Sequence, residues 1–101
     1  MKPMIVIVFG LPGSGKSFFA QRLARKMNAG YVNTDKLRKE LFSERSYTNH
    51  EKLSVYDRMF DEMKRYVREN KDLVLDGTFH KRKTRKKFAD EIKEGQQIIF
   101  I

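Results

Sequence analysis

Cysteine and tryptophan are absent from the 101 residues, and only two residues are prolines. Without cysteine, the chain can form neither disulfide bonds nor cysteine-ligated metal sites. Long hydrophobic runs are also missing: the longest, Met4 to Phe9, falls far short of the roughly 20 residues that span a bilayer. No apolar stretch near the N-terminus ends in small residues, as it would in a secretory signal peptide. We therefore expect a cytoplasmic protein without a membrane partner.

Acidic residues are few relative to basic ones. The chain has 13 Asp and Glu against 22 Lys and Arg, which gives a formal net charge of +9. The excess is greatest between His80 and Lys87, where six of eight residues are Lys or Arg. A field of this sign favours nucleotides, phosphates or nucleic acid as partners, without choosing among them. Hydrophobic residues make up 40% of the chain, too many for a disordered protein, and the length allows a single domain over 1–101.

Short apolar runs alternate with amphipathic stretches along the chain. This order predicts an α/β fold, in which a parallel sheet is covered by helices on both faces. We expect strands over residues 4–9, 31–33, 73–75 and 97–101. We expect helices over residues 16–28, 35–42, from the capping-box segment 48–51 through Val67, and from about 82 to 94.

The last expected strand, Gln97 to Ile101, is apolar, and no helix follows to cover it. An exposed apolar edge strand tends to pair with another chain. We expect the fold to be C-terminally incomplete. The chain is then either a piece of a longer protein or a homo-oligomer that completes its sheet through this edge strand.

The segment from Gly10 to Ser17 reads GLPGSGKS and matches the phosphate-binding pattern G-x-x-x-x-G-K-[ST] in full. Its glycines let backbone N–H groups point at phosphate oxygens, and the helix that follows adds its positive end. The Lys16 ammonium can reach the β- and γ-phosphates, and the Ser17 hydroxyl can ligate Mg²⁺. The alternative is an ordinary glycine-rich turn between a strand and a helix. The expected contacts to ATP or GTP are Gly10, Leu11, Pro12, Gly13, Ser14, Gly15, Lys16, Ser17 and Phe18.

A second candidate lies at the end of the expected strand 73–75. Asp76 places a carboxylate at the carboxyl end of a buried strand, where it can hold a water bound to Mg²⁺. Ser17 and Asp76 are thus the expected metal site. The alternative is that Asp76 only starts a turn, because Asp-Gly is a common turn pair.

Three motifs together resemble one group of enzymes. They are GLPGSGKS, the pair Asp35-x-x-Arg38, and Leu75-Asp-Gly-Thr-Phe79 followed by basic residues. From Met4 to Ile101 the chain resembles the P-loop kinases related to polynucleotide kinase, zeta toxin and adenylylsulfate kinase, in particular their small ATPase-like members. The resemblance implies a P-loop NTPase fold and Mg²⁺-dependent transfer of the γ-phosphate of ATP to a hydroxyl acceptor.

The same resemblance implies roles for individual residues. Lys16, Asp35 and Arg38 are the expected catalytic residues, with Asp35 accepting the proton of the acceptor hydroxyl. Arg38, Arg82 and Arg85 are the expected contacts to the acceptor. The alternatives are that Asp35 or Thr34 merely caps the short helix and that the arginines are solvated.

The sequence departs from that group after its fourth strand. The group continues into a lid that carries arginine, a fifth strand and an adenine-contacting loop, and none of these is in this sequence. Turnover by the 101 residues alone therefore stays open, as does the acceptor, which could be a nucleic-acid 5′-hydroxyl or a small molecule. Two other functions remain as alternatives: a basic nucleic-acid-binding module that uses the helix near 82–93, and an NTP-binding fragment without chemistry.

Overall fold

The computed structural model describes residues 4–10, 15–41, 49–79, 81–92 and 97–100. Its four strands are β1 (Met4–Phe9), β2 (Gly30–Asn33), β3 (Leu73–Gly77) and β4 (Gln97–Phe100). All pairings are parallel, and the strand order in the sheet is β2-β3-β1-β4. The carboxyl ends of the strands therefore lie along one edge of the sheet, where loops and helix N-termini can form a site.

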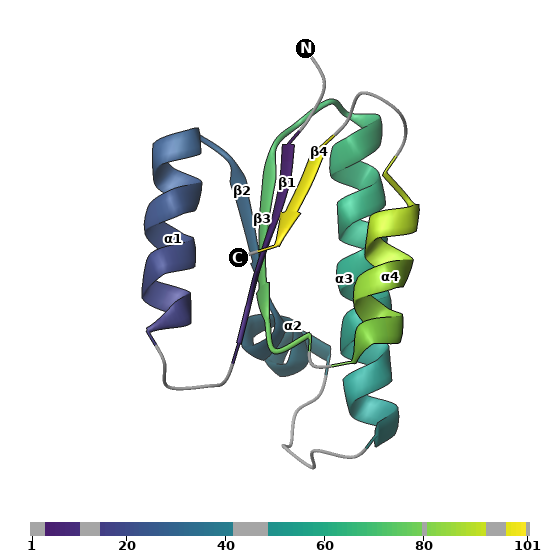
Figure 1. Ribbon diagram of the computed structural model, residues 1–101. Helices are drawn as coiled ribbons and strands as arrows, with labels where there is room; N and C mark the ends of the chain where they lie inside the picture. Colours follow the sequence, from purple (N-terminus) through teal and green to yellow (C-terminus); the bar gives the residue numbers. More distant parts are fainter. Residues whose placement is uncertain (1–3, 11–14, 42–48, 80, 93–96, 101) are drawn as a thin grey trace.

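Four helices accompany the sheet (Figure 1). They are α1 (Lys16–Met27), α2 (Thr34–Leu41), α3 (Asn49–Arg68) and α4 (Arg82–Asp90). The α1 helix covers one face of the sheet, α3 and α4 cover the other, and α2 lies at its lower edge in Figure 1. The predicted α/β fold with helices on both faces is confirmed.

Alternation along the strands divides the core between the two faces. Ile5 and Ile7 of β1 pack on the side of α3, in a cluster that includes Met59 and Met63. Val6 and Val8 point to the opposite face, where they meet the alanines of α1. A strand that is buried on both faces needs an apolar residue at every position, and this explains the continuous run in β1.

Several element boundaries differ from the predicted ones. The β2 strand includes Gly30, because the chain runs from the C-cap residue Asn28 straight into the sheet. A side chain at Gly30 would collide with the ring of Tyr66 from α3. The α4 helix ends at Asp90, before the predicted position 94, since the Ile92 N–H bonds the carbonyl of Ala89 in a tightened turn. Phe42, Glu94 and Ile101, where predicted elements ended, lie outside the described residues.

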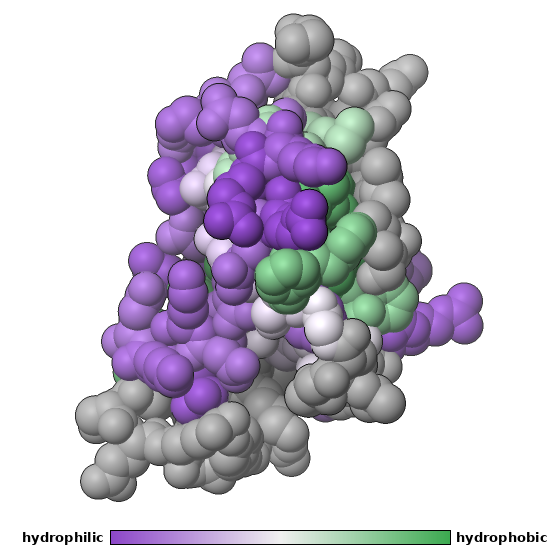
Figure 2. Space-filling model, turned by 90° about the vertical axis from the view of Figure 1, so that its left-hand side faces the viewer, coloured by the Kyte–Doolittle hydropathy of each residue, from purple (hydrophilic) through white to green (hydrophobic). Residues whose placement is uncertain are grey.

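The outer surface of α1 is mainly hydrophilic, with an apolar area beside it (Figure 2). Two large apolar residues of this helix, Phe18 and Phe19, are exposed. At the far side of the sheet, β4 pairs with β1 as its edge strand. The predicted strand is confirmed, whereas self-association through it stays a prediction.

Candidate functional site

The carboxyl ends of β1 and β3 bring the predicted phosphate-binding loop close to Asp76 of the predicted metal site. In the parallel register of the two strands, Val8 pairs with Asp76 and Phe9 with Gly77. Asp76 lies within β3, one residue before its end, so the alternative that Asp76 only starts a turn is wrong. Gly15 immediately precedes α1 with a φ of 81°, in the left-handed region that glycine enters without steric cost. Leu11, Pro12, Gly13 and Ser14 lie outside the described residues.

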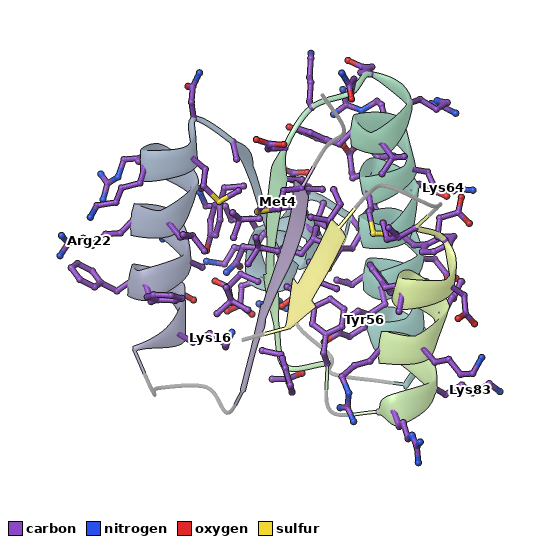
Figure 3. The ribbon with its side chains drawn as sticks, turned by 45° about the horizontal axis from the view of Figure 1, so that its top comes forward. Met4, Lys16, Arg22, Tyr56, Lys64 and Lys83 are labelled. Carbon is purple, nitrogen blue, oxygen red and sulfur yellow. The ribbon has the colours of Figure 1, made fainter. Side chains whose placement is uncertain are left out.

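Lys16 and Asp76 form an ion pair at this edge. The Lys16 ammonium donates to Asp76 Oδ1 at 2.5 Å, and the Asp76 side chain is fully buried while that of Lys16 is 12% exposed. Figure 3 shows Lys16 at the lower end of α1, on the side of the strands. A buried carboxylate needs such partners, because an unpaired buried charge is very costly.

Two residues of β2 bind the other oxygen of the same carboxylate. The Tyr31 hydroxyl donates to Asp76 Oδ2 at 2.6 Å, and the Asn33 amide donates to that oxygen at 2.9 Å. Sequence reasoning missed both residues. A signal was present, since Tyr31 and Asn33 are two apart in a strand and therefore point to the same face at its carboxyl end.

These donors decide the charge on Asp76. Burial alone raises the pKa of the Asp76 carboxyl, but hydrogen bonds from Lys16, Tyr31 and Ser17 outweigh it and lower the pKa below its usual value. Burial and the bond to Asp76 also raise the pKa of Tyr31, so its hydroxyl remains a donor. The Asp76 carboxylate is therefore held ionised next to Lys16 and Ser17.

A hollow of about 240 Å³ opens beside the N-terminus of α1. Its lining comes from α1, α2 and the segment after β3, namely Gly15, Lys16, Ser17, Phe18, Thr34, Asp35 and Thr78. Lys16, Ser17, Phe18 and Asp35 of the predicted site thus meet at one place. Asp35 is 70% exposed, so its carboxylate is open to a solute.

The cap of α2 differs from the predicted alternative. Asn33, and neither Thr34 nor Asp35, caps this helix: its Oδ1 accepts hydrogen bonds from the N–H groups of Asp35 at 2.8 Å and of Lys36 at 3.2 Å. Sequence reasoning placed the cap one or two residues late because the pairing of β2 with β3, which ends at Asn33, is a long-range contact. The carboxylate of Asp35 therefore does not serve as the helix cap.

The three predicted arginines do not line the hollow. Arg38 follows Asp35 by one helical turn, with its Nη2 at 3.7 Å from Asp35 Oδ1. Arg82 is exposed at the first position of α4. Arg85 donates to the carbonyl of Phe79 at 2.6 Å and lies over the ring of Phe9. Their contacts to an acceptor stay predictions.

The segment after β3 has an unusual backbone. Phe79 has a φ of 43°, a left-handed conformation that is rare for a bulky residue and costs of order 1 kcal/mol. Its N–H donates to the Tyr56 hydroxyl at 2.9 Å, and its buried ring meets the rings of Tyr56 and Phe88 edge to face. Tyr56 thus packs against Phe79 and also fixes the backbone next to Thr78 in the hollow.

The described residues fit a Mg²⁺ site in which phosphate oxygens of a bound nucleotide would supply part of the ligands. Within the described ranges, no three His, Asp or Glu side chains group to hold a metal ion by themselves. Ser17 and Asp76 supply one hydroxyl and one ionised carboxylate near each other. Oxygen ligands of this kind, few in number, are typical of Mg²⁺ sites that use substrate phosphates.

No described helix is both long and apolar enough to cross a membrane.

Comparison with known proteins gives the family. A family model described as an AAA domain matches residues 5–96. No curated protein matches the chain. Three solved structures illustrate the similarity of fold. A chain of the Pnkp1/Rnl/Hen1 RNA repair complex has a TM-score of 0.80 and 23% identity, with 99% of this chain and 32% of that one covered.

Two kinases complete the comparison. A gluconokinase from Sinorhizobium meliloti has a TM-score of 0.71 at 18% identity, over 97% of this chain and 57% of that one. The hexameric APS kinase from Thiobacillus denitrificans has a TM-score of 0.77 at 19% identity, over 98% of this chain and 21% of that one. The chain thus spans less than two thirds of each of these proteins. At these identities the likeness establishes the fold, and the predicted P-loop kinase-like fold is confirmed.

Proposed function

Since the chain belongs to the family described as AAA domain, we propose that it is a kinase that transfers the γ-phosphate of ATP, or of GTP, to a hydroxyl group with Mg²⁺. The observation that carries this proposal is the hollow in which Lys16, Ser17 and Asp35 share one lining. Phosphoryl transfer needs two reactants in line and the neutralisation of charge. A cation, a hydroxyl and an exposed carboxylate around one small space are suited to both needs.

The roles follow from the positions. Lys16 and the first backbone N–H groups of α1, which have no side-chain cap among the described residues, bind the phosphates. Ser17 and Asp76 would hold Mg²⁺, which neutralises negative charge on the phosphate oxygens. Asp35, across the hollow on α2, orients the acceptor hydroxyl and takes its proton as the hydroxyl oxygen attacks the γ-phosphorus. The bond from the γ-phosphorus to the bridging oxygen breaks in the same transfer, and the nucleoside diphosphate leaves with that oxygen.

The acceptor is a hydroxyl compound whose class stays open between a nucleic-acid 5′ end and a small molecule. The net charge of +9 favours an anionic acceptor in either class. Arg38 is the candidate contact next to Asp35, and Arg82 is exposed at the start of α4. Arg85 could contact an acceptor only after giving up its bond to the Phe79 carbonyl.

The proposal is tested first by binding. Lys16→Ala removes the ammonium that compensates the phosphates, so we expect calorimetry to show binding of MgATP by the wild type and none by this variant. If the protein is instead a nucleic-acid-binding module, both proteins bind oligonucleotides alike and neither binds MgATP. Circular dichroism of the two proteins checks that the variant is folded.

Turnover then separates a kinase from an NTP-binding fragment without chemistry. With hydroxyl acceptors of both classes, we expect Asp35→Asn to bind MgATP like the wild type and to transfer phosphate at least about 100-fold more slowly. Asp57→Asn, a change at an exposed carboxylate of α3, is the matched control. Unchanged turnover by Asp35→Asn would contradict the role of Asp35.

A further inference from the structure

Asn33 is a buried polar residue that the roles above do not use. Its side chain is engaged at both ends. The Oδ1 atom accepts from the backbone N–H groups of Asp35 and Lys36, while Nδ2 donates to Tyr31 Oη at 3.0 Å and to Asp76 Oδ2 at 2.9 Å. The reverse orientation would set the NH₂ group against two N–H donors, so the network fixes which end faces which partner.

One amide therefore joins two parts of the hollow. On one side it holds the first turn of α2, which carries Asp35; on the other it holds the carboxylate beside Lys16. Asn33 is only 8% exposed and does not line the hollow, so it acts through its neighbours. We propose that Asn33 is a positioning residue that fixes the Asp76 carboxylate relative to the first turn of α2, and so keeps the phosphate side and the acceptor side of the hollow in one geometry.

This inference rests on the proposed function, in which Lys16 turns to the phosphates. When Lys16 turns to the phosphates, Asp76 Oδ1 loses its ammonium partner, and the Ser17 hydroxyl is assigned to Mg²⁺, so the donors on Oδ2 have to keep the carboxylate in place. Those donors are Tyr31 and Asn33. A group that orients a metal-side carboxylate in this way is worth about 10- to 100-fold in metal affinity or activity.

Two substitutions at Asn33 distinguish its role as the N-cap of α2 from its hydrogen bond to Asp76. In Asn33→Ser the hydroxyl still caps α2, because serine is as good an N-cap as asparagine, but the amide donor to Asp76 is gone. In Asn33→Ala both are lost. The readout is calorimetry of ATP with Mg²⁺ and with EDTA, and the quantity compared is the gain in affinity that Mg²⁺ gives.

We expect this Mg²⁺-dependent gain to fall about tenfold or more in both variants. The melting temperature should fall further for Asn33→Ala than for Asn33→Ser, since only alanine removes the cap. If Asn33→Ser keeps the whole Mg²⁺-dependent gain of the wild type, Asn33 is only a cap and the inference is overturned.

A second variant leaves the cap untouched. Tyr31→Phe removes the other donor to Asp76 Oδ2, and it should lower the same Mg²⁺-dependent gain. Tyr66→Phe, which removes a hydroxyl from a tyrosine on the other face of the sheet, is the matched control and should leave the gain unchanged. An unchanged gain in Tyr31→Phe would contradict the inference even if Asn33→Ser failed to fold. Absence of MgATP binding by the wild type would instead overturn the proposed function and the inference with it.

Discussion

A carboxylate withdrawn from water, as that of Asp76 is, stays ionised only while its donors remain in place. Lys16 and Ser17 supply donors from α1, and Tyr31 and Asn33 supply two from β2. Breaking such a group by removing one partner leaves a buried charge uncompensated, and this makes each member sensitive to substitution. Acid should therefore act on the folded protein through this carboxylate.

The sign of the pH effect follows from the lowered pKa of Asp76. A carboxyl whose pKa is lower in the folded state stabilises the protein above its unfolded pKa, and this contribution is lost as the pH falls through the folded pKa. As the pH falls below about 4, the wild type should lose more free energy of unfolding than Asp76→Asn.

Urea unfolding at pH 6 and at pH 3 measures this difference. Asp90→Asn, at an exposed carboxylate of α4 that pairs with Lys86, is the control and should follow the wild type. An equal loss for the wild type and Asp76→Asn would contradict the assignment.

Among the elements, the segment between β3 and α4 depends on α3 for its shape. The left-handed Phe79 has no local cause, because neither glycine nor asparagine stands there. It is held by Tyr56 from α3 and by Arg85 from α4, which bond its N–H and its carbonyl. These hydrogen bonds from α3 and α4 thus fix the backbone next to Thr78, which lines the hollow.

Tyr56→Phe tests this dependence. It keeps the ring and removes the hydroxyl, so the buried N–H of Phe79 loses its acceptor, at a cost of about 1–3 kcal/mol. We expect chemical denaturation to show this loss, together with a lower affinity for MgATP, because Thr78 would shift. Tyr66→Phe on the same helix should lose less than half as much. Equal losses in the two variants would show that the hydroxyl of Tyr56 does not hold the segment.

The order of strands and helices could be predicted from the sequence because each element carries a local signal. The β-branched run of β1, the glycine-rich loop, and the periodicity of α3 at Tyr56, Phe60, Met63 and Val67 each depend on neighbours along the chain. The position of Asp76 beside β1 followed from the apolar strand before it. These signals were enough for the fold and for one side of the hollow.

The remaining parts of the site arise from contacts between distant segments. Tyr31 and Asn33 lie 45 and 43 residues from Asp76 along the chain, and no local pattern reports the pairing that brings them together. Arg85 is a further example. The resemblance implies a contact to the acceptor, whereas in the structure its guanidinium donates to the backbone carbonyl of Phe79. The candidate site residues were predicted from sequence, whereas Tyr31 and Asn33, which hold the Asp76 carboxylate, were not.

At the scale of the whole molecule, β2 and β4 are the two edge strands of the sheet in the part of the chain that the structure describes. The backbone of an edge strand has hydrogen-bonding groups on its outer side that can pair with another strand. We expect light scattering to show a mass above that of one 12.0 kDa chain, rising with protein concentration. Added salt should favour this association, because it screens the repulsion between two chains that each carry a formal net charge of +9. A constant mass of one chain at high concentration would contradict association through β4.

In the proposed function, the Lys16–Asp76 ion pair would discriminate among anions before any reaction takes place. The Lys16 ammonium already binds the Asp76 carboxylate at 2.5 Å. An incoming anion therefore binds Lys16 only if its total interaction with the site is stronger than that of the carboxylate with the ammonium. A single orthophosphate would interact with Lys16 mainly through its own charge. In the proposed function, a triphosphate would also contact the start of α1 along its length, so we expect this exchange of partners to favour long phosphate chains over short ones.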